Sequence, residues 1–236
     1  MKSSPEDSLI ELDQVTRDFG QVKVLKGISF TIRKGEYLAV TGPSGSGKST
    51  LMNQMGLLDM PTSGHIKVKG QIIDQLSDAQ VAALRSRTIG FVFQAFHLID
   101  SRTALENVEL GMLYKGLPRS ERKERAIAAL ERVGLAHRMS AYPTTLSGGE
   151  QQRVAVARAV ASDIDLLLAD EPTGNLDSAT TSKIMELFDQ LHATGLTIAL
   201  ITHDLRLAKH ALRNIEIADG QIVRDENHTA RKEAQC

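Results

Sequence analysis

Four short apolar runs organise the chain, and a polar or glycine residue follows each of them. They span residues 37–40, 89–93, 166–169 and 197–201. Runs of this length that do not alternate are typical of strands in a parallel sheet covered on both faces, and amphipathic helical patterns lie between them. The pattern predicts an α/β fold with a mostly parallel core sheet.

Two further stretches alternate between apolar and polar residues. One is KGISFTIRKGE, in which Ile28, Phe30 and Ile32 are the apolar positions, and the other is GHIKVKGQII. Strict alternation is typical of half-exposed antiparallel strands. We therefore expect an antiparallel β subdomain beside the core sheet.

From Ser101 to about Ala161 the pattern is helical only. Thr103 and Glu106 have the spacing of a capping box, as do Ser77 and Gln80 further upstream. The stretch ERKERAIAALERVGL repeats apolar residues at helical spacing, at Ile127, Leu130 and Val133. A helical subdomain is therefore expected to interrupt the sheet.

Polar residues follow all four apolar runs. They are the loop Gly42–Lys48, then Gln94, then Asp170 with Glu171, and finally His203. In open parallel sheets ligands bind beyond the carboxyl ends of the strands. We expect these elements to gather at one edge of the sheet.

The stretch GPSGSGKST fits the phosphate-loop pattern G-x-x-x-x-G-K-[ST] between a strand and a helix. Its glycines let backbone N–H groups converge on phosphates, Lys48 reaches the β and γ phosphates, and the Ser49 hydroxyl serves Mg²⁺. A glycine-rich turn without ligand is the alternative, which the flanking elements disfavour. Nucleotide contacts are expected from Gly42, Pro43, Ser44, Gly45, Ser46, Gly47, Lys48, Ser49 and Thr50. The apolar face expected for the helix is Leu51, Met52, Met55 and Leu58.

The stretch LLLADEP ends a buried strand with two carboxylates. Because side chains alternate along a strand, Asp170 and Glu171 cannot act from the same side. Asp170 is the expected Mg²⁺ ligand and Glu171 the expected general base for water. Such pairs are often merely solvated, but the phosphate loop in the same chain favours the functional interpretation.

A second glycine pair occurs in LSGGEQQR, residues 146–153. Ser147 and Glu150 have capping-box spacing, so a well-capped helix is the simplest interpretation. Gly148 and Gly149 remain unexplained by it, because glycine in a first turn lowers helix stability. We expect a close approach to this backbone, and a helix N-terminus can bind phosphate.

Composition narrows the possible partners. The 236 residues carry a formal net charge of -1, 4% aromatic residues and no Trp, so nucleic-acid binding is not expected. The single cysteine, Cys236, excludes an internal disulfide and fits a reducing compartment. The N-terminal residues lack the apolar core of a signal peptide, and no apolar run approaches the roughly 20 residues of a membrane-spanning helix. We expect no membrane insertion.

The order of GPSGSGKST, FQ, LSGGEQQR, LLLADEPTGNLD and ITHD resembles the nucleotide-binding domain of ATP-binding cassette (ABC) transporters. The resemblance covers about residues 8–225. It implies a P-loop NTPase fold of the ABC ATPase type, with a RecA-like core at about 8–94 and 162–225 and a helical subdomain at about 95–161. It also implies ATP and Mg²⁺ as cofactors. Residues 226–236 are polar and are expected to be a disordered tail.

The resemblance also explains the second glycine pair. In this family two cassettes pack head to tail, so Ser147, Gly148 and Gly149 would serve the nucleotide held by the partner. A second ATPase subunit is therefore required, and a homodimer is expected because closed two-fold dimers are common. A paralogous partner remains the alternative.

Further roles rest on the resemblance alone. Phe19 would stack on adenine, and Gln94 would contact Mg²⁺ or the attacking water. Asp177 would communicate between monomers, and His203 would lie near the γ-phosphate as a catalytic residue.

At a finer level the sequences of these motifs and their flanks are most similar to the subfamily of MacB, LolD and FtsE, bacterial ATPases that work with a membrane permease. This implies a motor subunit, peripheral to the cytoplasmic face of the inner membrane, for export, lipoprotein extraction or mechanotransmission. Phe96 and Leu98 would contact the permease, whereas Leu105 and Leu110 are expected inside the helical subdomain. The alternatives are the ATPase of an amino-acid-type importer and a non-transport regulatory ABC ATPase.

Overall fold

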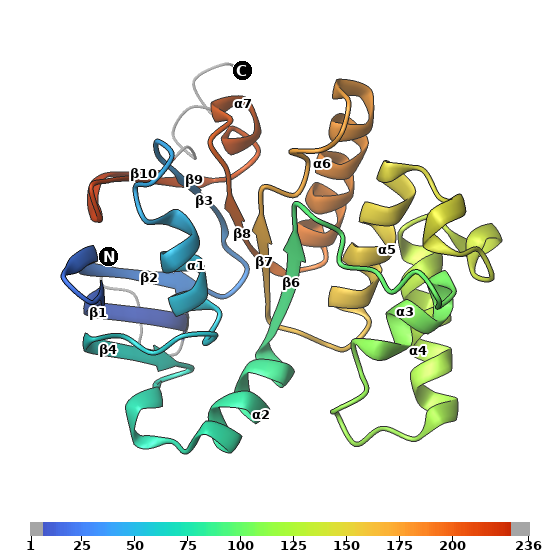
Figure 1. Cartoon of the computed structure of the whole chain (residues 1–236), viewed down its shortest axis with the longest axis horizontal. Coiled ribbons are helices and arrows are strands. Elements are labelled where there is room, and N and C mark those ends of the chain that lie inside the picture. Colours follow the sequence, from blue (N-terminus) through green and yellow to red (C-terminus); the bar gives the residue numbers. More distant parts are fainter. Residues whose placement is uncertain (1–6, 228–236) are drawn as a thin grey trace. The chain divides into compact units, whose positions relative to one another are not determined.

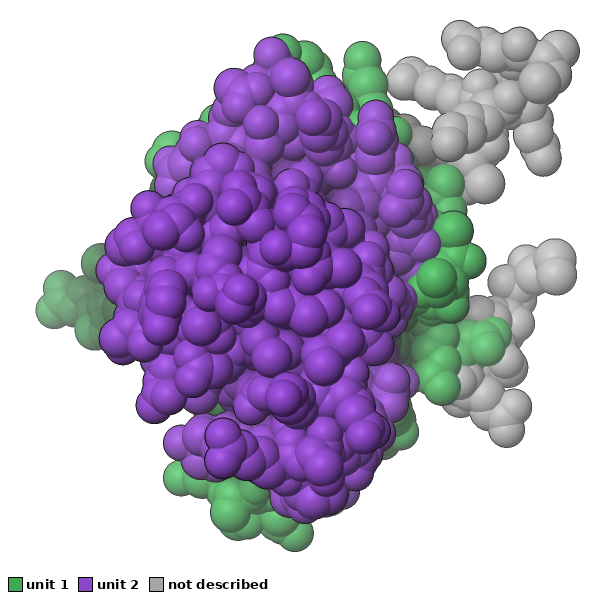
Figure 2. Space-filling view, turned by 90° about the vertical axis from the view of Figure 1, so that its right-hand side faces the viewer, with its two compact units in different colours: residues 1–85, 192–236 green, residues 86–191 purple. Residues whose placement is uncertain are grey.

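The computed structural model describes residues 7–227. The described residues form two compact units, one from residues 7–85 and 192–227 and the other from residues 86–191 (Figure 2). The first is called unit 1 and the second unit 2. Cys236 and residues 228–236 of the expected tail lie outside the described residues.

Unit 1 contains an antiparallel sheet (Figure 1). Its order is β2-β1-β4-β5, formed by β1 (Ser8–Phe19), β2 (Val22–Arg33), β4 (Ser63–Val68) and β5 (Gln71–Ile72). Ile28, Phe30 and Ile32 are buried along β2 and alternate with more exposed residues. The predicted antiparallel β subdomain is confirmed.

Unit 1 also contributes four strands to a mainly parallel sheet. They are β3 (Tyr37–Thr41), β8 (Thr197–Ile201), β9 (Arg213–Ala218) and β10 (Gln221–Asn227), in the order β10-β9-β3-β8. The central strand β3 pairs in parallel with both β8 and β9, and every residue of β3 and β8 is buried. Continuous burial is the reason these strands read as unbroken apolar runs.

The helix after the phosphate loop, α1 (Lys48–Met55), is shorter than its apolar pattern suggests. Leu51, Met52 and Met55 are buried as expected, but the prediction for Leu58 is wrong, since this side chain is 46% exposed. Leu57 adopts φ 53, and the Leu58 N–H donates to the Asn53 carbonyl. This is a Schellman ending, which turns the chain out of the helix one turn early.

Unit 1 is completed by short helical segments. They are η2 (Ile73–Gln75), α7 (Leu205–Ala208) and most of α2 (Asp78–Thr88), which continues into unit 2. The predicted capping box at the start of α2 is confirmed, because the Ser77 N–H donates to Gln80 Oε1 at 2.9 Å and the Gln80 N–H to Ser77 Oγ at 3.4 Å.

Unit 2 combines a parallel strand pair with a group of helices. The strands are β6 (Ile89–Phe93) and β7 (Leu166–Asp170), and α6 (Ser178–Ala193) follows β7. The inserted segment forms α3 (Ala104–Leu110), α4 (Arg119–Arg132), η3 (Ala136–Arg138), η4 (Pro143–Thr145) and α5 (Gly148–Val160). Helices α3, α4 and α5 pack against one another. The predicted fold class, with its parallel and antiparallel strands and inserted helices, is confirmed.

Within residues 7–227, no helix combines the length and the apolar character that a membrane crossing requires.

Candidate functional site

The phosphate-loop residues connect β3 to α1 in unit 1. A Cβ on Gly42 would lie 2.1 Å from the Ile217 carbonyl oxygen, so the backbone runs directly against β9 there. Gly47, at φ 102, occupies the N-cap of α1, and a Cβ on it would lie 3.0 Å from the Leu25 side chain. Because the cap is glycine, no side chain occupies the first N–H groups of α1, and these donors are available to an anion.

Two polar groups of this loop suit a phosphate. Lys48 Nζ donates to the carbonyl oxygens of Gly42 and Pro43, both at 2.9 Å, so the ammonium group lies over the loop. Ser46 Oγ is buried and has no hydrogen-bond partner among the described residues. An unpaired buried hydroxyl is costly, and a phosphate oxygen would satisfy it. The loop therefore fits a nucleotide phosphate.

His203 follows β8 in unit 1, next to the strand that leads into the phosphate loop. The Thr202 N–H donates to the Val40 carbonyl at 3.1 Å. Asp204 caps α7 and pairs with Arg206, whose hydrogen bonds lower the pKa of Asp204. His203 is exposed and lies between Thr202 and Asp204, which both make hydrogen bonds. Within unit 1, the expected placement of His203 and the phosphate loop at one edge of the sheet therefore holds.

Phe19 ends β1 and faces Val22 across the hairpin. Its side chain is 51% exposed. Two nearby residues of β2 lie against the phosphate loop. A Cβ on Gly47 would be 3.2 Å from the Val24 carbonyl oxygen and 3.0 Å from the Leu25 side chain. The hairpin that carries Phe19 thus lies directly beside this loop.

In unit 2 the register of two strands brings three predicted residues together. Phe93 pairs with Asp170 across β6 and β7, so Gln94 and Glu171 both follow at the same edge. Glu171 adopts φ 45, which is uncommon for a residue other than glycine. Gln152, which the sequence did not single out, donates from Nε2 to the Pro172 carbonyl at 2.5 Å and the Phe93 carbonyl at 3.4 Å. Gln152, which lies in α5, thus links the ends of β6 and β7 through its side chain.

Gln94 also contacts the loop that follows Glu171. Its Nε2 donates to Asn175 Oδ1 at 3.1 Å, and Asn175 Nδ2 donates to the Gln94 carbonyl at 3.2 Å. Asp177, two residues further on, accepts from the Thr180 N–H at 3.0 Å and the Thr180 hydroxyl at 2.6 Å. These bonds lower the pKa of Asp177, which here caps the start of α6.

The second glycine pair opens α5, and its predicted capping box is confirmed. The Ser147 hydroxyl accepts from the Glu150 N–H, and Glu150 accepts from the Ser147 N–H at 2.8 Å. Arg138 Nε donates to the other carboxylate oxygen of Glu150 at 2.9 Å. The Ser147 N–H first, and Arg138 second, lower the pKa of Glu150 to about 2.

The two glycines of this pair have different surroundings. A Cβ on Gly149 would lie 2.4 Å from Thr180 Cγ2, so α6 of the same chain packs against that backbone. A Cβ on Gly148 would lie 3.3 Å from the end of the Leu176 side chain, a tight contact that a small shift of that side chain relieves, and 3.7 Å from the Phe96 ring. The close approach expected from the sequence is thus supplied at Gly149 by Thr180.

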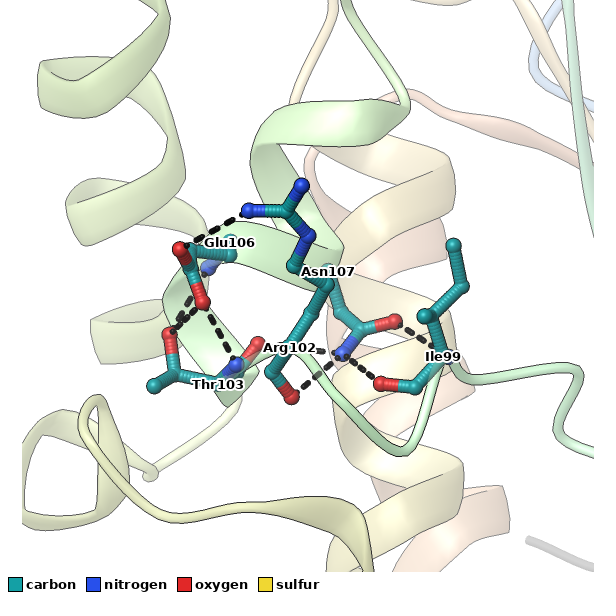
Figure 3. Close-up of polar contacts among 5 residues, drawn as sticks. All are labelled: Ile99, Arg102, Thr103, Glu106 and Asn107. Carbon is teal, nitrogen blue, oxygen red and sulfur yellow. Dashed lines mark hydrogen bonds and ion pairs between the residues drawn. The ribbon is translucent and has the colours of Figure 1, made fainter.

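Two further side chains, which the sequence analysis did not identify, hold the segment after Gln94. Arg158 of α5 donates to the carbonyls of Phe96 and His97, and burial lowers its pKa. Asn107 of α3 is fully buried (Figure 3). Its Oδ1 accepts from the Ile99 N–H, and its Nδ2 donates to the carbonyls of Ile99, Arg102 and Thr103. Asparagine is disfavoured in helix interiors, so its position within a helical stretch is the sequence feature that indicates a structural role for Asn107.

The apolar residues of this segment are only partly buried. Phe96 and Leu98 are half-buried. Leu105 and Leu110, expected inside the helical subdomain, are also half-buried and line a groove of about 590 Å³ beside α3 and the start of α4. The expectation of an interior position is therefore wrong for both, because the groove leaves one side of α3 uncovered.

Comparisons with known proteins agree with this geometry. The family model described as ABC transporter matches residues 25–174. An uncharacterised ABC transporter ATP-binding protein of Thermotoga maritima is 50% identical over 87% of this chain and 88% of its own length. The chain therefore belongs to the ABC transporter family, as an ABC ATPase domain.

Other relatives are longer proteins. The macrolide export ATP-binding/permease protein MacB of Hyphomonas neptunium is 51% identical over 92% of this chain but 34% of its own length. The chain thus spans about a third of that relative. The dimeric ATP-binding cassette MJ0796 in a post-hydrolysis state with ADP and Pi is 40% identical, with a TM-score of 0.84 over 93% of this chain and 99% of that one.

Proposed function

We propose that this chain is the ATP-hydrolysing motor subunit of a bacterial ABC transporter. Two copies close around two molecules of Mg·ATP and drive a separate membrane permease, in MacB-like export, lipoprotein extraction or mechanotransmission. The observation that carries the proposal is the phosphate loop, where Lys48 and the unpartnered Ser46 hydroxyl surround a glycine-lined backbone. The dimeric cassette MJ0796 and the ATP-binding/permease relatives support the dimer and the membrane partner.

The side chains divide the work in this proposal. The phosphate loop, residues 42–50, binds the phosphates, and Phe19 stacks on adenine. Ser49, Asp170 and Gln94 would supply oxygen ligands to Mg²⁺ beside the phosphate oxygens, which suits an ion that is seldom enclosed by protein ligands alone. No group of three or more His, Cys, Asp or Glu suited to a metal occurs within residues 7–227.

Hydrolysis in this proposal depends on a proton acceptor at the strand end. Glu171 accepts a proton from the attacking water, and His203 and Gln94 orient the groups around the γ-phosphate. Ser147, Gly148 and Gly149 contact the γ-phosphate held by the partner, and Asp177 lies at the contact between monomers. The protein works at the cytoplasmic face of the inner membrane, where Phe96 and Leu98 contact the permease.

Replacing Glu171 tests the catalytic part of the proposal. Glu171→Gln keeps the shape of the side chain but removes the base, so turnover should fall by about 100-fold or more. ATP binding should persist, and size-exclusion chromatography with ATP should show a stable dimer. As a control, Lys48→Ala should weaken ATP binding itself. Turnover of Glu171→Gln at the wild-type rate would refute the assignment.

The dimer is tested by dilution. If Ser147 serves the partner's nucleotide, turnover per chain should rise with protein concentration. A constant rate across a range in which the protein is shown to be monomeric would refute this arrangement.

A further inference from the structure

A cation holds the ring of Phe19 from one side. The Arg17 guanidinium carbon lies 4.6 Å from the centroid of the Phe19 ring. The two residues are two positions apart on β1, and this contact places their side chains on the same side of the strand. With one face of the ring against Arg17 and the side chain 51% exposed, an open face remains for a planar ligand.

Arg17 is itself fixed by an acidic residue. Its Nε lies 2.7 Å from Asp59 Oδ2, and both side chains are largely covered, with 24% and 27% exposed. The contact is an ion pair and is not aligned as a hydrogen bond. An ion pair that is partly shielded from water is stronger than one at the open surface. Arg17 is therefore restrained in front of the ring.

The strand end that carries both residues is fastened to the same segment as Asp59. The Thr62 N–H donates to the Thr16 carbonyl at 2.9 Å, and the Asp18 N–H donates to Thr62 Oγ1 at 3.0 Å. Thr16 and Ser63 share a further hydrogen bond between their hydroxyls at 2.8 Å. Backbone and side chain of the β1 end are thus both tied to residues 59–63.

Residues 59–63 come shortly after the helix that starts at the phosphate loop. Helix α1 begins at Lys48 and ends at Met55, four residues before Asp59. A continuous path therefore runs from the loop through α1 to Asp59, and from Asp59 through Arg17 to the Phe19 ring. This path sets the ring relative to the phosphate-binding backbone.

We propose that Arg17, held by Asp59, is a positioning residue that fixes the Phe19 ring for stacking on the nucleotide base. The inference rests on the proposed function, in which Phe19 contacts adenine. A cation over one face of an aromatic ring is attracted by its π electrons, and the ring is then held flat for a base on the other face. An unrestrained ring would lose side-chain freedom on each binding event.

The test compares two ligands, MgADP, which contains the base, and magnesium pyrophosphate, which does not. Isothermal titration calorimetry would be run on wild type, Phe19→Leu, Arg17→Gln and the double variant. Phe19→Leu should weaken ADP about tenfold and leave pyrophosphate unchanged. Arg17→Gln should weaken ADP about three- to tenfold, also without effect on pyrophosphate. In the Phe19→Leu background, Arg17→Gln should add less than about twofold.

Two conservative variants complete the design. Arg17→Lys keeps the charge but loses the planar group, and Asp59→Asn removes the anchor, so both should show part of the Arg17→Gln effect. If Arg17→Gln does not fold, these two variants carry the same comparison. Thermal unfolding of each variant checks the fold.

Each contrary result has a distinct meaning. Unchanged ADP affinity in Arg17→Gln, with a loss in Phe19→Leu, would overturn the role of Arg17 and leave the proposed function intact. Equal losses for ADP and pyrophosphate would show that Arg17 acts on the phosphate loop or on the fold. A full Arg17→Gln effect in the Phe19→Leu background would mean that Arg17 acts independently of the ring. No loss in Phe19→Leu would remove the adenine role of Phe19, and with it the inference.

Discussion

Gln94 and Asn175 exchange two hydrogen bonds, one between their side chains and one from the Asn175 amide to the Gln94 carbonyl. The residue before Asn175 is Gly174, where a Cβ would lie 2.8 Å from Gln94 Nε2. The loop after Glu171 is therefore closely packed on the residue that follows β6. Any movement of one loop has to break or carry along the other.

Removing this link should loosen Gln94. In Asn175→Ala we expect faster amide hydrogen exchange at residues 94–96 and a several-fold lower turnover, with little change in ATP affinity. Each lost bond is worth about 1 kcal/mol or less at this exposed position, so global stability should change little. Asn175→Asp keeps the acceptor for Gln94 Nε2 and should lie between wild type and Asn175→Ala. Unchanged exchange at residues 94–96 in Asn175→Ala would contradict the link.

The two glycines of the LSGGEQQR loop should respond differently to alanine. Gly149→Ala places a methyl group against Thr180 Cγ2 and should lower the free energy of unfolding by about 1–3 kcal/mol. Gly148→Ala contacts only the flexible end of Leu176 and Phe96 and should change it by less than about 1 kcal/mol. Urea unfolding measures both.

Thr180→Ser provides the matched rescue for Gly149→Ala. It removes Cγ2 but keeps the hydroxyl that donates to Asp177. In combination with Gly149→Ala it should recover most of the lost stability, and absence of recovery would show that the clash lies elsewhere.

The capping carboxylate should make stability depend on pH. The pKa of Glu150 is about 2 in the folded chain, below its ordinary 4.5. Its contribution is therefore complete above about pH 5 and is lost as the pH falls towards 2. The difference in unfolding free energy between wild type and Glu150→Gln should shrink by about 1–2 kcal/mol between about pH 6 and pH 3.

Urea unfolding at several pH values between 6 and 3 measures this difference. Arg138→Gln should retain most of the pH dependence, because the Ser147 N–H is the larger cause of the lowered pKa. A difference that does not change with pH would contradict the assignment.

Asn107 should be a major determinant of stability in unit 2. Asn107→Ala removes the side-chain partner of the Ile99 N–H and of the Ile99 and Arg102 carbonyls, whereas the Thr103 carbonyl keeps the N–H of residue 107; we expect a loss of about 2–4 kcal/mol in urea unfolding. Thr103→Ala removes only the cap of the same helix and should cost about 1 kcal/mol. Equal losses for both variants would show that the Asn107 bonds are not the main contribution.

Local features were predictable where a short stretch of sequence determines them. The buried runs became β3, β6, β7 and β8, and the spacing of Ser147 and Glu150 gave a capping box. The end of α1 was not predictable in this way, because it depends on a left-handed Leu57 where glycine is usual. Apolar spacing alone therefore extended the helix to Leu58.

Side chains that bind distant carbonyls were also missed. Arg158 and Phe96 are 62 positions apart, and Gln152 and Phe93 are 59 apart, so no local pattern indicates either contact. Arg17 is closer to Phe19, but its significance depends on Asp59, which only the packing of the loop after α1 reveals. The sequence motifs indicated the chemistry of the site, whereas the residues that hold these motifs in place could be identified only from the structure.

The order of the strands has a consequence for synthesis of the chain. Strand β3, which leads into the phosphate loop, pairs only with β8 and β9 among the described strands, and both come from the last quarter of the sequence. A ribosome that adds about 5–20 residues per second needs roughly eight to thirty seconds to proceed from β3 to β8. During that time β3 has neither sheet partner, and the whole of unit 2, residues 86–191, is synthesised before β8 begins. The nascent chain therefore carries an unpaired apolar strand, a feature that favours aggregation, until β8 and β9 emerge.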